Sequence, residues 1–321
     1  VWEYDTGLRY VFSDPFWSGE YAVYSPSALA FSASPNADAD DYISQDEDLQ
    51  RDLPDVSQYA PPDPLEVMLD VVAFRGDDGQ TDLVIASEVS VPDDLREMRS
   101  GAWILRDGRE ESAREDQNPT LVPLVSLPSG RVWTRAAQFA TTPGDVDVHT
   151  EAADVNDGAA GWARETVRVP AWPPGMQLSG LLLVRGLDDG RPAGPGEIAR
   201  RGTVMQPAAS ATFGATDPVG VYAEVYGLSA DTGEARYAVQ AALVPVDGRP
   251  GIIRAIGGLF GRGRRRGVSV EVEETTRGAT ASVALLLDAS RQSAGVYTLT
   301  LTVTDRATGE AVETLREVTL L

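Results

Sequence analysis

The sequence predicts an all-β protein of two antiparallel β-sandwiches, immunoglobulin-like or fibronectin-like, preceded by an extended N-terminal arm. Three observations support this fold class. Apolar residues occur in short runs of strand length, clusters of Gly, Pro and Asp separate the runs at the spacing of a sandwich, and several runs alternate between apolar and polar residues. No segment favours a long helix.

Residues 1–64 are expected to form an N-terminal hairpin followed by an acidic arm. Residues 8–12 have strand-like composition, and residues 20–24 are the expected hairpin partner. Residues 32–64 are polar, acidic and rich in Pro, as in a linker or long surface arm. We expect this region to lack a core of its own and to be ordered by partners or by the sandwiches.

Residues 65–198 are expected to form the first sandwich. The turn signal Gly76-Asp77-Asp78-Gly79 predicts a hairpin between its first two strands. A Pro- and Gly-rich stretch at 190–196 is expected to end the domain. The predicted strands are 65–75, 81–91, 101–106, 132–139, 162–169 and 178–185.

Residues 199–321 are expected to form the second sandwich. Residues 298–304 alternate strictly between Thr and apolar side chains, which predicts a strand with one buried and one wet face. Hairpin loops are expected at 231–234 and 305–310. The predicted strands are 219–226, 236–243, 268–274, 282–287, 296–304 and 313–320.

Composition excludes several classes of function. The formal net charge is -22, and all 27 basic residues are Arg, so nucleic acid and anionic lipid are disfavoured except where Arg is concentrated. Cys is absent, which excludes disulfides, thiolate catalysis and iron–sulfur ligation. No apolar run approaches the ~20 residues of a transmembrane helix, so no membrane span is expected.

Several segments, in their order along the chain, resemble the proteins that carry the GWxTD domain. Residues 1–21 are similar to the C-terminal end of that domain, and residues 70–76 to the first strand of the sandwich that follows it. Residues 221–228 and 295–305 are similar to the opening and the closing hairpin of the family's second sandwich. The Gly-Trp-x-Thr-Asp motif itself is absent, so we expect the upstream half of that domain to have been removed or lost.

The resemblance implies an exported bacterial protein that is periplasmic or otherwise extracytoplasmic and membrane-associated, and the family brings no catalytic residues. We therefore expect a non-enzymatic scaffold that binds other proteins and braces a larger membrane complex. The family's setting suggests one specific case, an extrinsic subunit of a bacterial photosynthetic reaction-centre–antenna assembly. The alternative is a hydrolase acting on carbohydrate or peptide, or a binding module of the cell envelope.

Catalytic chemistry has little support in the residues. His149 is the only histidine, no Gly-x-Ser-x-Gly elbow accompanies it, and we expect it to be solvated on a polar strand face beside Asp147. A zinc site would need at least two carboxylates around this one imidazole. Paired acids for glycoside hydrolysis are inevitable among 49 carboxylates, so their presence alone assigns nothing. No catalytic residue and no cofactor other than Ca²⁺ is predicted.

Residues 36–47 resemble an EF-hand loop. Oxygen-bearing side chains fall at loop positions 1, 3, 5, 9 and 12, where Ca²⁺ ligands belong. Asp41 occupies the sixth position, where the sharp turn favours Gly, and Pro35 and Pro54 leave little room for flanking helices. The alternative is a solvated acidic linker. The candidate ligands are Asn36, Asp38, Asp40, Ser44 and Glu47.

The strongest basic cluster follows an apolar stretch at 252–260. Together they predict a short element at a membrane surface, peripheral and without a span. The alternative is a long hairpin loop whose apolar part packs on the sandwich and whose arginines meet the chain's own acids. The cluster consists of Arg262, Arg264, Arg265 and Arg266, and a second candidate partner surface consists of Trp2, Tyr4, Phe16 and Trp17.

If residues 36–47 bind Ca²⁺, Glu47→Gln is expected to remove most of the affinity, because the loop loses its bidentate charged ligand. Titration calorimetry of the full chain measures this directly. Absence of heat from the unaltered protein at millimolar Ca²⁺ would reject the site.

Overall fold

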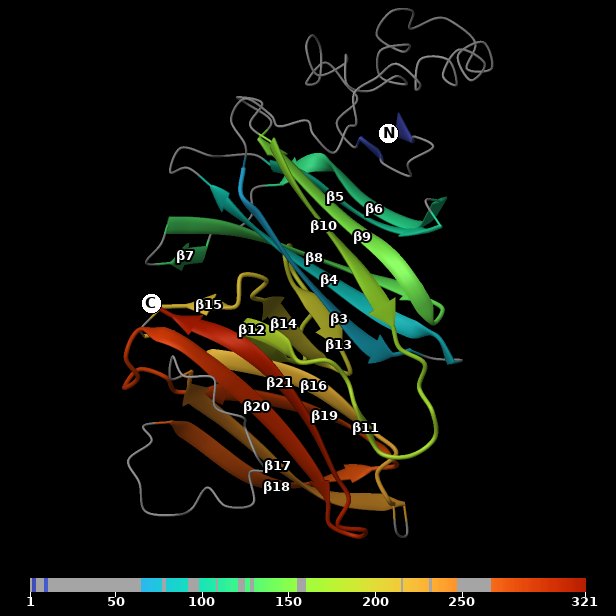
Figure 1. Cartoon of the computed structure of the whole chain (residues 1–321), viewed down its shortest axis with the longest axis vertical. Coiled ribbons are helices and arrows are strands. Elements are labelled where there is room, and N and C mark those ends of the chain that lie inside the picture. The colour runs from blue at the N-terminus through green and yellow to red at the C-terminus, as the bar shows by residue number, and fades with distance from the viewer. Residues whose placement is uncertain are drawn as a thin grey trace, which may run out of the picture.

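Four β-sheets stacked face to face make up the body of the protein (Figure 1), as described by a computed structural model. We call them, in stacking order, the first outer, first inner, second inner and second outer sheets. A short N-terminal hairpin joins β1 (Trp2–Glu3) to β2 (Arg9–Tyr10). The structure describes residues 2–3, 9–10, 65–76, 79–91, 98–107, 109–120, 125–127, 130–154, 160–214, 216–230, 233–246 and 267–321.

The first sandwich consists of two four-stranded antiparallel sheets. The first inner sheet has the order β3 (Val67–Arg75), β4 (Thr81–Val91), β8 (Gly130–Thr141) and β7 (Val125–Leu127). The first outer sheet has the order β10 (Ala160–Val169), β9 (Gly144–Asp154), β5 (Met98–Arg106) and β6 (Arg109–Thr120). Alternate side chains of both sheets, including Leu83, Ile104 and Val148, form the core between them.

The second sandwich pairs a six-stranded sheet with a five-stranded one. The second inner sheet runs β11 (Gln177–Leu178), β16 (Val219–Tyr226), β12 (Leu182–Asp189), β14 (Thr203–Pro207) and β13 (Ile198–Arg200), with β19 (Thr280–Leu287) also on β16. The second outer sheet runs β15 (Thr212–Phe213), β21 (Ala311–Leu320), β20 (Gly295–Asp305), β17 (Glu234–Pro245) and β18 (Val268–Arg277). Among these pairs, β15–β21 is parallel and the others are antiparallel.

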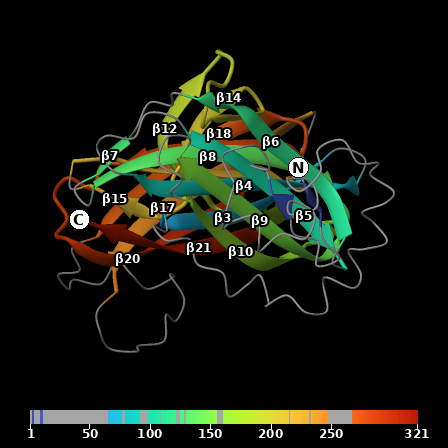
Figure 2. The same cartoon turned by 90° about the horizontal axis from the view of Figure 1, so that it is seen from above.

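The two inner sheets pack against each other through a further apolar core. Val72, Phe74 and Val84 face it from the first sandwich. The second sandwich contributes Leu182, Val184, Ile198, Met205 and Tyr222. Both inner sheets are therefore covered on both faces, and the view from above shows the strands of the layers overlying one another (Figure 2).

Strand β16 illustrates why the stack is tight at this interface. Every one of its eight residues is buried. A Cβ atom at Gly220 would lie 2.4 Å from the carbonyl oxygen of Val184, so glycine permits the close approach of β16 to β12. The strand lies at the centre of the second inner sheet, with β19 on one side and β12 on the other.

The expected all-β architecture of antiparallel sandwiches is confirmed, and the strands at 81–91 and 219–226 have the predicted bounds. The immunoglobulin-like or fibronectin-like type stays a prediction. The hairpins around residues 76–79 and 305–310 form as expected. Residues 231–234 do not close a hairpin, because β16 and β17 belong to different sheets.

The change from one sandwich to the other comes earlier than the expected boundary between residues 198 and 199. That position lies inside β13, and β11 and β12 already pair with β16. The chain therefore crosses between the sandwiches after β10, through the Pro-rich stretch 170–176. At the N-terminus, Arg9–Tyr10 pairs with Trp2–Glu3, and the expected partner at 20–24 lies outside the described residues.

Phe74→Ala is expected to destabilise both sandwiches by about 3–5 kcal/mol, because it opens a cavity in the core they share. The Phe74 ring is fully buried and lies 5.7 Å from the Tyr222 ring in the second sandwich. Hydrogen exchange of amides in β4 and β16 should show the loss in both. The control Leu315→Ala, at a side chain that is 54% exposed, should change stability by less than about 0.5 kcal/mol. Loss of protection confined to β4 would mean that the sandwiches are independent.

Candidate functional site

The buried carboxylate of Glu224, on β16, is the centre of a charge network between the sandwiches. Its Oε1 accepts hydrogen bonds from Arg200 Nε at 2.9 Å and Tyr222 Oη at 3.0 Å. Its Oε2 accepts from Arg201 Nε at 2.8 Å and Tyr226 Oη at 2.9 Å. Glu224 has no exposed surface, so these four donors replace the water that an ionised carboxylate needs.

A tight turn delivers both arginines to Glu224. Strands β13 and β14 are joined by Arg201 and Gly202, whose φ angles are 46° and 88°. Two central residues with positive φ are characteristic of a type I′ hairpin turn. The turn holds a non-glycine residue in a sparsely populated backbone region at Arg201, whose side chain forms an ion pair with Glu224.

Arg200 carries the network across the interface into the first sandwich. Its Nη1 donates to Asp82 Oδ2 on β4 at 2.9 Å, and its guanidinium lies 4.5 Å from the centre of the Phe74 ring. One buried cation is thus held by two acids from different sandwiches and by an aromatic face. Tyr226 adds another link, since its hydroxyl oxygen accepts a hydrogen bond from the Arg75 N–H at 2.8 Å.

These contacts keep Glu224 ionised. Burial by itself would raise the pKa of Glu224, but the hydrogen bonds and charges of Arg200 and Arg201 outweigh it and hold that pKa below its usual range. Burial and the neighbouring carboxylate both raise the pKa of Tyr222 and of Tyr226, so the two phenols stay protonated and donate. The network is fully charge-paired near neutral pH.

A second buried ion pair joins the inner sheets. Arg185 on β12 donates from Nε to Glu88 Oε1 at 2.8 Å and from Nη2 to Glu88 Oε2 at 3.0 Å. Its Nη1 also donates to the Thr212 carbonyl at 2.7 Å, and the Ser210 N–H donates to Glu88 Oε2 at 3.0 Å. This bidentate geometry is the one in which arginine binds a carboxylate most strongly.

Asp70 forms the third link. It lies on β3 and accepts a hydrogen bond from Arg316 on β21, the second outer sheet. Burial raises the pKa of Asp70 despite the opposing pull of Arg316. Its Oδ2 is buried and has no hydrogen-bond partner among the described residues. Three carboxylates of the first sandwich, at residues 70, 82 and 88, thus each meet an arginine of the second.

His149 differs from its expected solvated state. It lies on β9 and is only 4% exposed, and burial, with a further contribution from Arg164, lowers its pKa to about 4. Asp147 does not bond to it but accepts from Arg164 Nη2 at 2.7 Å and Thr166 Oγ1 at 2.6 Å. The imidazole is therefore neutral near pH 7, and Asp147 is engaged with Arg164 and Thr166.

The other predicted site residues are not brought into this network. The calcium candidates lie outside the described residues: Asn36, Asp38, Asp40, Ser44 and Glu47. The same holds for the arginine cluster and for most of the aromatic surface, namely Arg262, Arg264, Arg265, Arg266, Tyr4, Phe16 and Trp17. For Trp2, the structure describes only the backbone, in β1. The strands that flank the arginine cluster, β17 and β18, pair antiparallel. Within the described part of the chain, no group of three or more His, Asp or Glu side chains could hold a metal ion, and no helix could span a membrane.

The sequence patterns did not predict the charge network, although one local pattern pointed to it. Tyr222, Glu224 and Tyr226 share one face of an otherwise apolar strand, where alternation places a single acid between two phenols. An acid in that setting needs cations, and Arg200 and Arg201 supply them at the turn between β13 and β14. No known protein-family model matches the chain, and no curated protein has a significantly similar sequence.

Glu224→Gln is expected to lower the free energy of unfolding by about 3–5 kcal/mol at pH 7, because Arg200 and Arg201 lose their common anion. Tyr222→Phe is the matched control and should cost less, about 1.5–3 kcal/mol, the value of one hydrogen bond to a charged group, because both arginines keep their anion. Chemical denaturation of the two variants and the unaltered chain measures both.

The difference in unfolding free energy between the unaltered chain and Glu224→Gln should also depend on pH. The pKa of Glu224 is lower in the folded than in the unfolded state, so its stabilisation is present above the unfolded value of about 4.3 and is lost as pH falls through the folded value. The gap between the unaltered chain and Glu224→Gln should therefore shrink on acidification. A gap that stays constant down to pH 3 would show that the carboxylate charge is not what stabilises the interface.

Proposed function

We propose that the protein is a non-enzymatic scaffold, a membrane-extrinsic subunit that holds other proteins and braces a larger membrane complex. The observation that carries the proposal is the buried ionic interface between the inner sheets. Domains joined by small polar interfaces move relative to each other by default. Here an apolar core and arginine–carboxylate contacts at Asp82, Glu88 and Asp70 oppose such motion, as a spacer of fixed shape requires.

The two predicted attachment segments join this body at different layers. Residues 1–64 lead into Leu65, whose N–H donates to the Ala160 carbonyl of the first outer sheet at 2.9 Å. Residues 247–266, which contain the arginine cluster, connect β17 to β18 in the second outer sheet. Stacked sheets lie about 10 Å apart, so the two connection points are held at separate levels of one body.

Exposed apolar side chains adjoin the origin of the arginine segment. Val246 is 48% exposed and Val296 is 39% exposed, and the Val246 N–H donates to the Val296 carbonyl at 2.9 Å. Apolar surface next to a run of arginines is the combination that favours an interface between water and an anionic membrane. Four arginines near such a surface contribute about 1 kcal/mol each, which is useful but insufficient for permanent attachment.

The resemblance to GWxTD-domain proteins supports the rest of the proposal. It favours a periplasmic or other extracytoplasmic location and a role in assembly. As the specific partner we propose a photosynthetic reaction-centre–antenna complex. Co-purification of the chain from solubilised native membranes tests this part, and its recovery only in the soluble fraction would refute it.

Replacing Arg262, Arg264, Arg265 and Arg266 with Gln is expected to lower binding to anionic vesicles and to reduce its dependence on salt. Charges on a surface are screened over about 8 Å at physiological salt, so binding through this cluster should weaken steeply as salt rises. Co-sedimentation with vesicles containing anionic lipid, from low to high salt, measures both effects.

A matched control separates local from net charge. Replacing Arg168, Arg236, Arg277 and Arg291 with Gln makes the same change in net charge at four exposed positions scattered over the sandwiches. This control should bind like the unaltered chain apart from a small general loss. Equal pelleting of both variants and the unaltered chain at low salt would rule out the cluster as the attachment site.

A further inference from the structure

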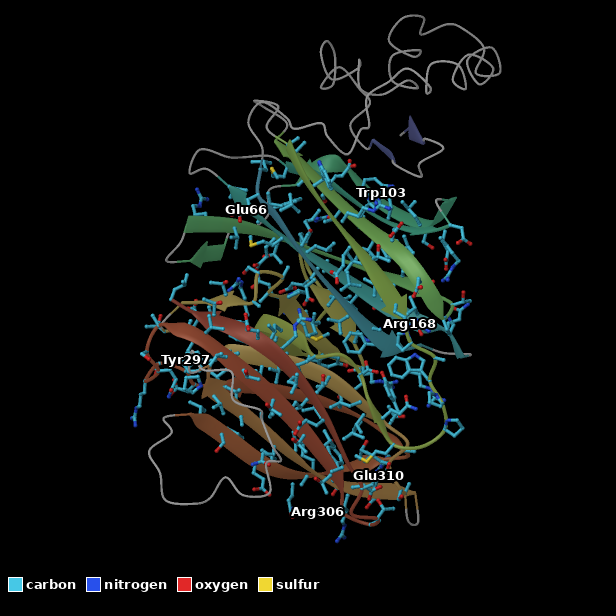
Figure 3. The ribbon with its side chains drawn as sticks, in the orientation of Figure 1. Glu66, Trp103, Arg168, Tyr297, Arg306 and Glu310 are labelled. Carbon is cyan, nitrogen blue, oxygen red and sulfur yellow. The ribbon has the colours of Figure 1, made fainter. Side chains whose placement is uncertain are left out.

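The outward face of the first outer sheet is buried where solvent exposure is expected. Along β5 and β9 alternate side chains, such as Ile104 and Val148, form the sandwich core, so their neighbours point away from it. Three of these outward side chains, Trp103, Leu105 and His149, are only 2%, 1% and 4% exposed. Figure 3 shows Trp103 in this sheet, at the end of the stack opposite the second outer sheet.

No strand of the described part of residues 65–321 covers this face. The sheet that packs on the first outer sheet there is the first inner sheet, and it lies against the opposite face. Neighbours within one sheet leave a large aromatic ring partly exposed to water. The burial of Trp103 therefore requires a covering segment from elsewhere in the chain.

Two buried polar atoms indicate which chemical groups the covering segment should carry. Trp103 and His149 stand directly opposite each other in the register of β5 and β9. Trp103 Nε1 and His149 Nε2 are both buried and have no hydrogen-bond partner among the described residues. A buried polar atom left unpaired costs about 1–3 kcal/mol, so a cover that also carries polar groups is favoured over a purely apolar one.

We propose that residues 1–31 of the same chain dock on this face. The segment alternates aromatic with polar residues, which matches an apolar surface with two unpaired polar atoms. Its described part, the β1–β2 hairpin, lies over the first outer sheet in both views (Figures 1 and 2). The proposal concerns the chain's own fold and does not depend on the proposed membrane role.

Residues 32–64, which connect residues 1–31 to the first sandwich, join the body close to this face and are long enough to reach across it. Leu65 is hydrogen-bonded to Ala160 at the start of β10, the edge strand of this same sheet. Residues 32–64 can span up to about 100 Å when extended, at roughly 3.3 Å per residue, which is more than the face requires. Trp162 on β10 is 45% exposed and marks the rim of the covered area.

Distance measurements between spin labels test the docking in the full chain. The chain has no Cys, so two introduced cysteines are the only labelling sites. Trp162→Cys at the rim and Ser13→Cys within the segment should give a narrow distance distribution below about 30 Å. The control pair, Ser13→Cys with Leu315→Cys, reports on the second outer sheet, three sheet spacings of about 10 Å further away, and should give clearly longer distances.

Dilution with unlabelled protein identifies the occupant. A short distance that persists on dilution supports docking within one chain, whereas a short distance that disappears assigns the face to a second copy and overturns the proposal. Distances to residue 162 as long or as broad as those to residue 315 would also overturn it. Replacing Trp2, Tyr10 and Phe12 with Ser should broaden the short distance, and an unchanged distribution would exclude the aromatic side chains as the contact.

Discussion

A carboxylate without access to water holds the arginine that joins the two sandwiches. Glu224 is fully buried, and removing an ion from water costs several kcal/mol unless charged donors replace the water. Arg200 and Arg201 both reach it from the β13–β14 turn, which has positive φ angles at two consecutive residues. Arg200 in turn engages Asp82, so the position of a turn in one sandwich is coupled to a strand in the other.

Such a network contributes more to positioning than to net stability. Apolar residues of similar volume often replace a buried ion pair without loss of stability, but an apolar interface can slide or rotate. Charged pairs with fixed geometry penalise such displacements, because any shift leaves a buried charge unpaired. The core around Phe74 supplies the attraction between the inner sheets, and the arginine–carboxylate pairs at Asp82 and Glu88 favour one arrangement of them.

The use of arginine alone as the basic residue suits this arrangement. Arg185, Arg200 and Arg316 direct their planar guanidinium groups inward to acids of the first sandwich. The outer face of the second outer sheet instead exposes glutamates, among them Glu271 and Glu313. Part of the positive charge is thus used inside the molecule, and the surface there is more acidic than the composition alone suggests.

Much of the fold follows from local sequence, because strand length, alternation and turn residues are local properties. Thr81–Val91 and Val219–Tyr226 were predicted with their observed bounds. Strand β6, with the sequence Arg-Glu-Glu-Ser-Ala-Arg-Glu, was missed because an edge strand needs no apolar alternation. Alternation places Tyr222, Glu224 and Tyr226 on one face but does not reveal whether another sheet covers that face. The same limit applies to His149, expected in solvent and found buried.

The sequence by itself determined the strands and which residues share a face. Only the tertiary structure decided which faces are covered, and with them the sandwich boundary and the buried charges, because stacking brings together residues more than a hundred positions apart.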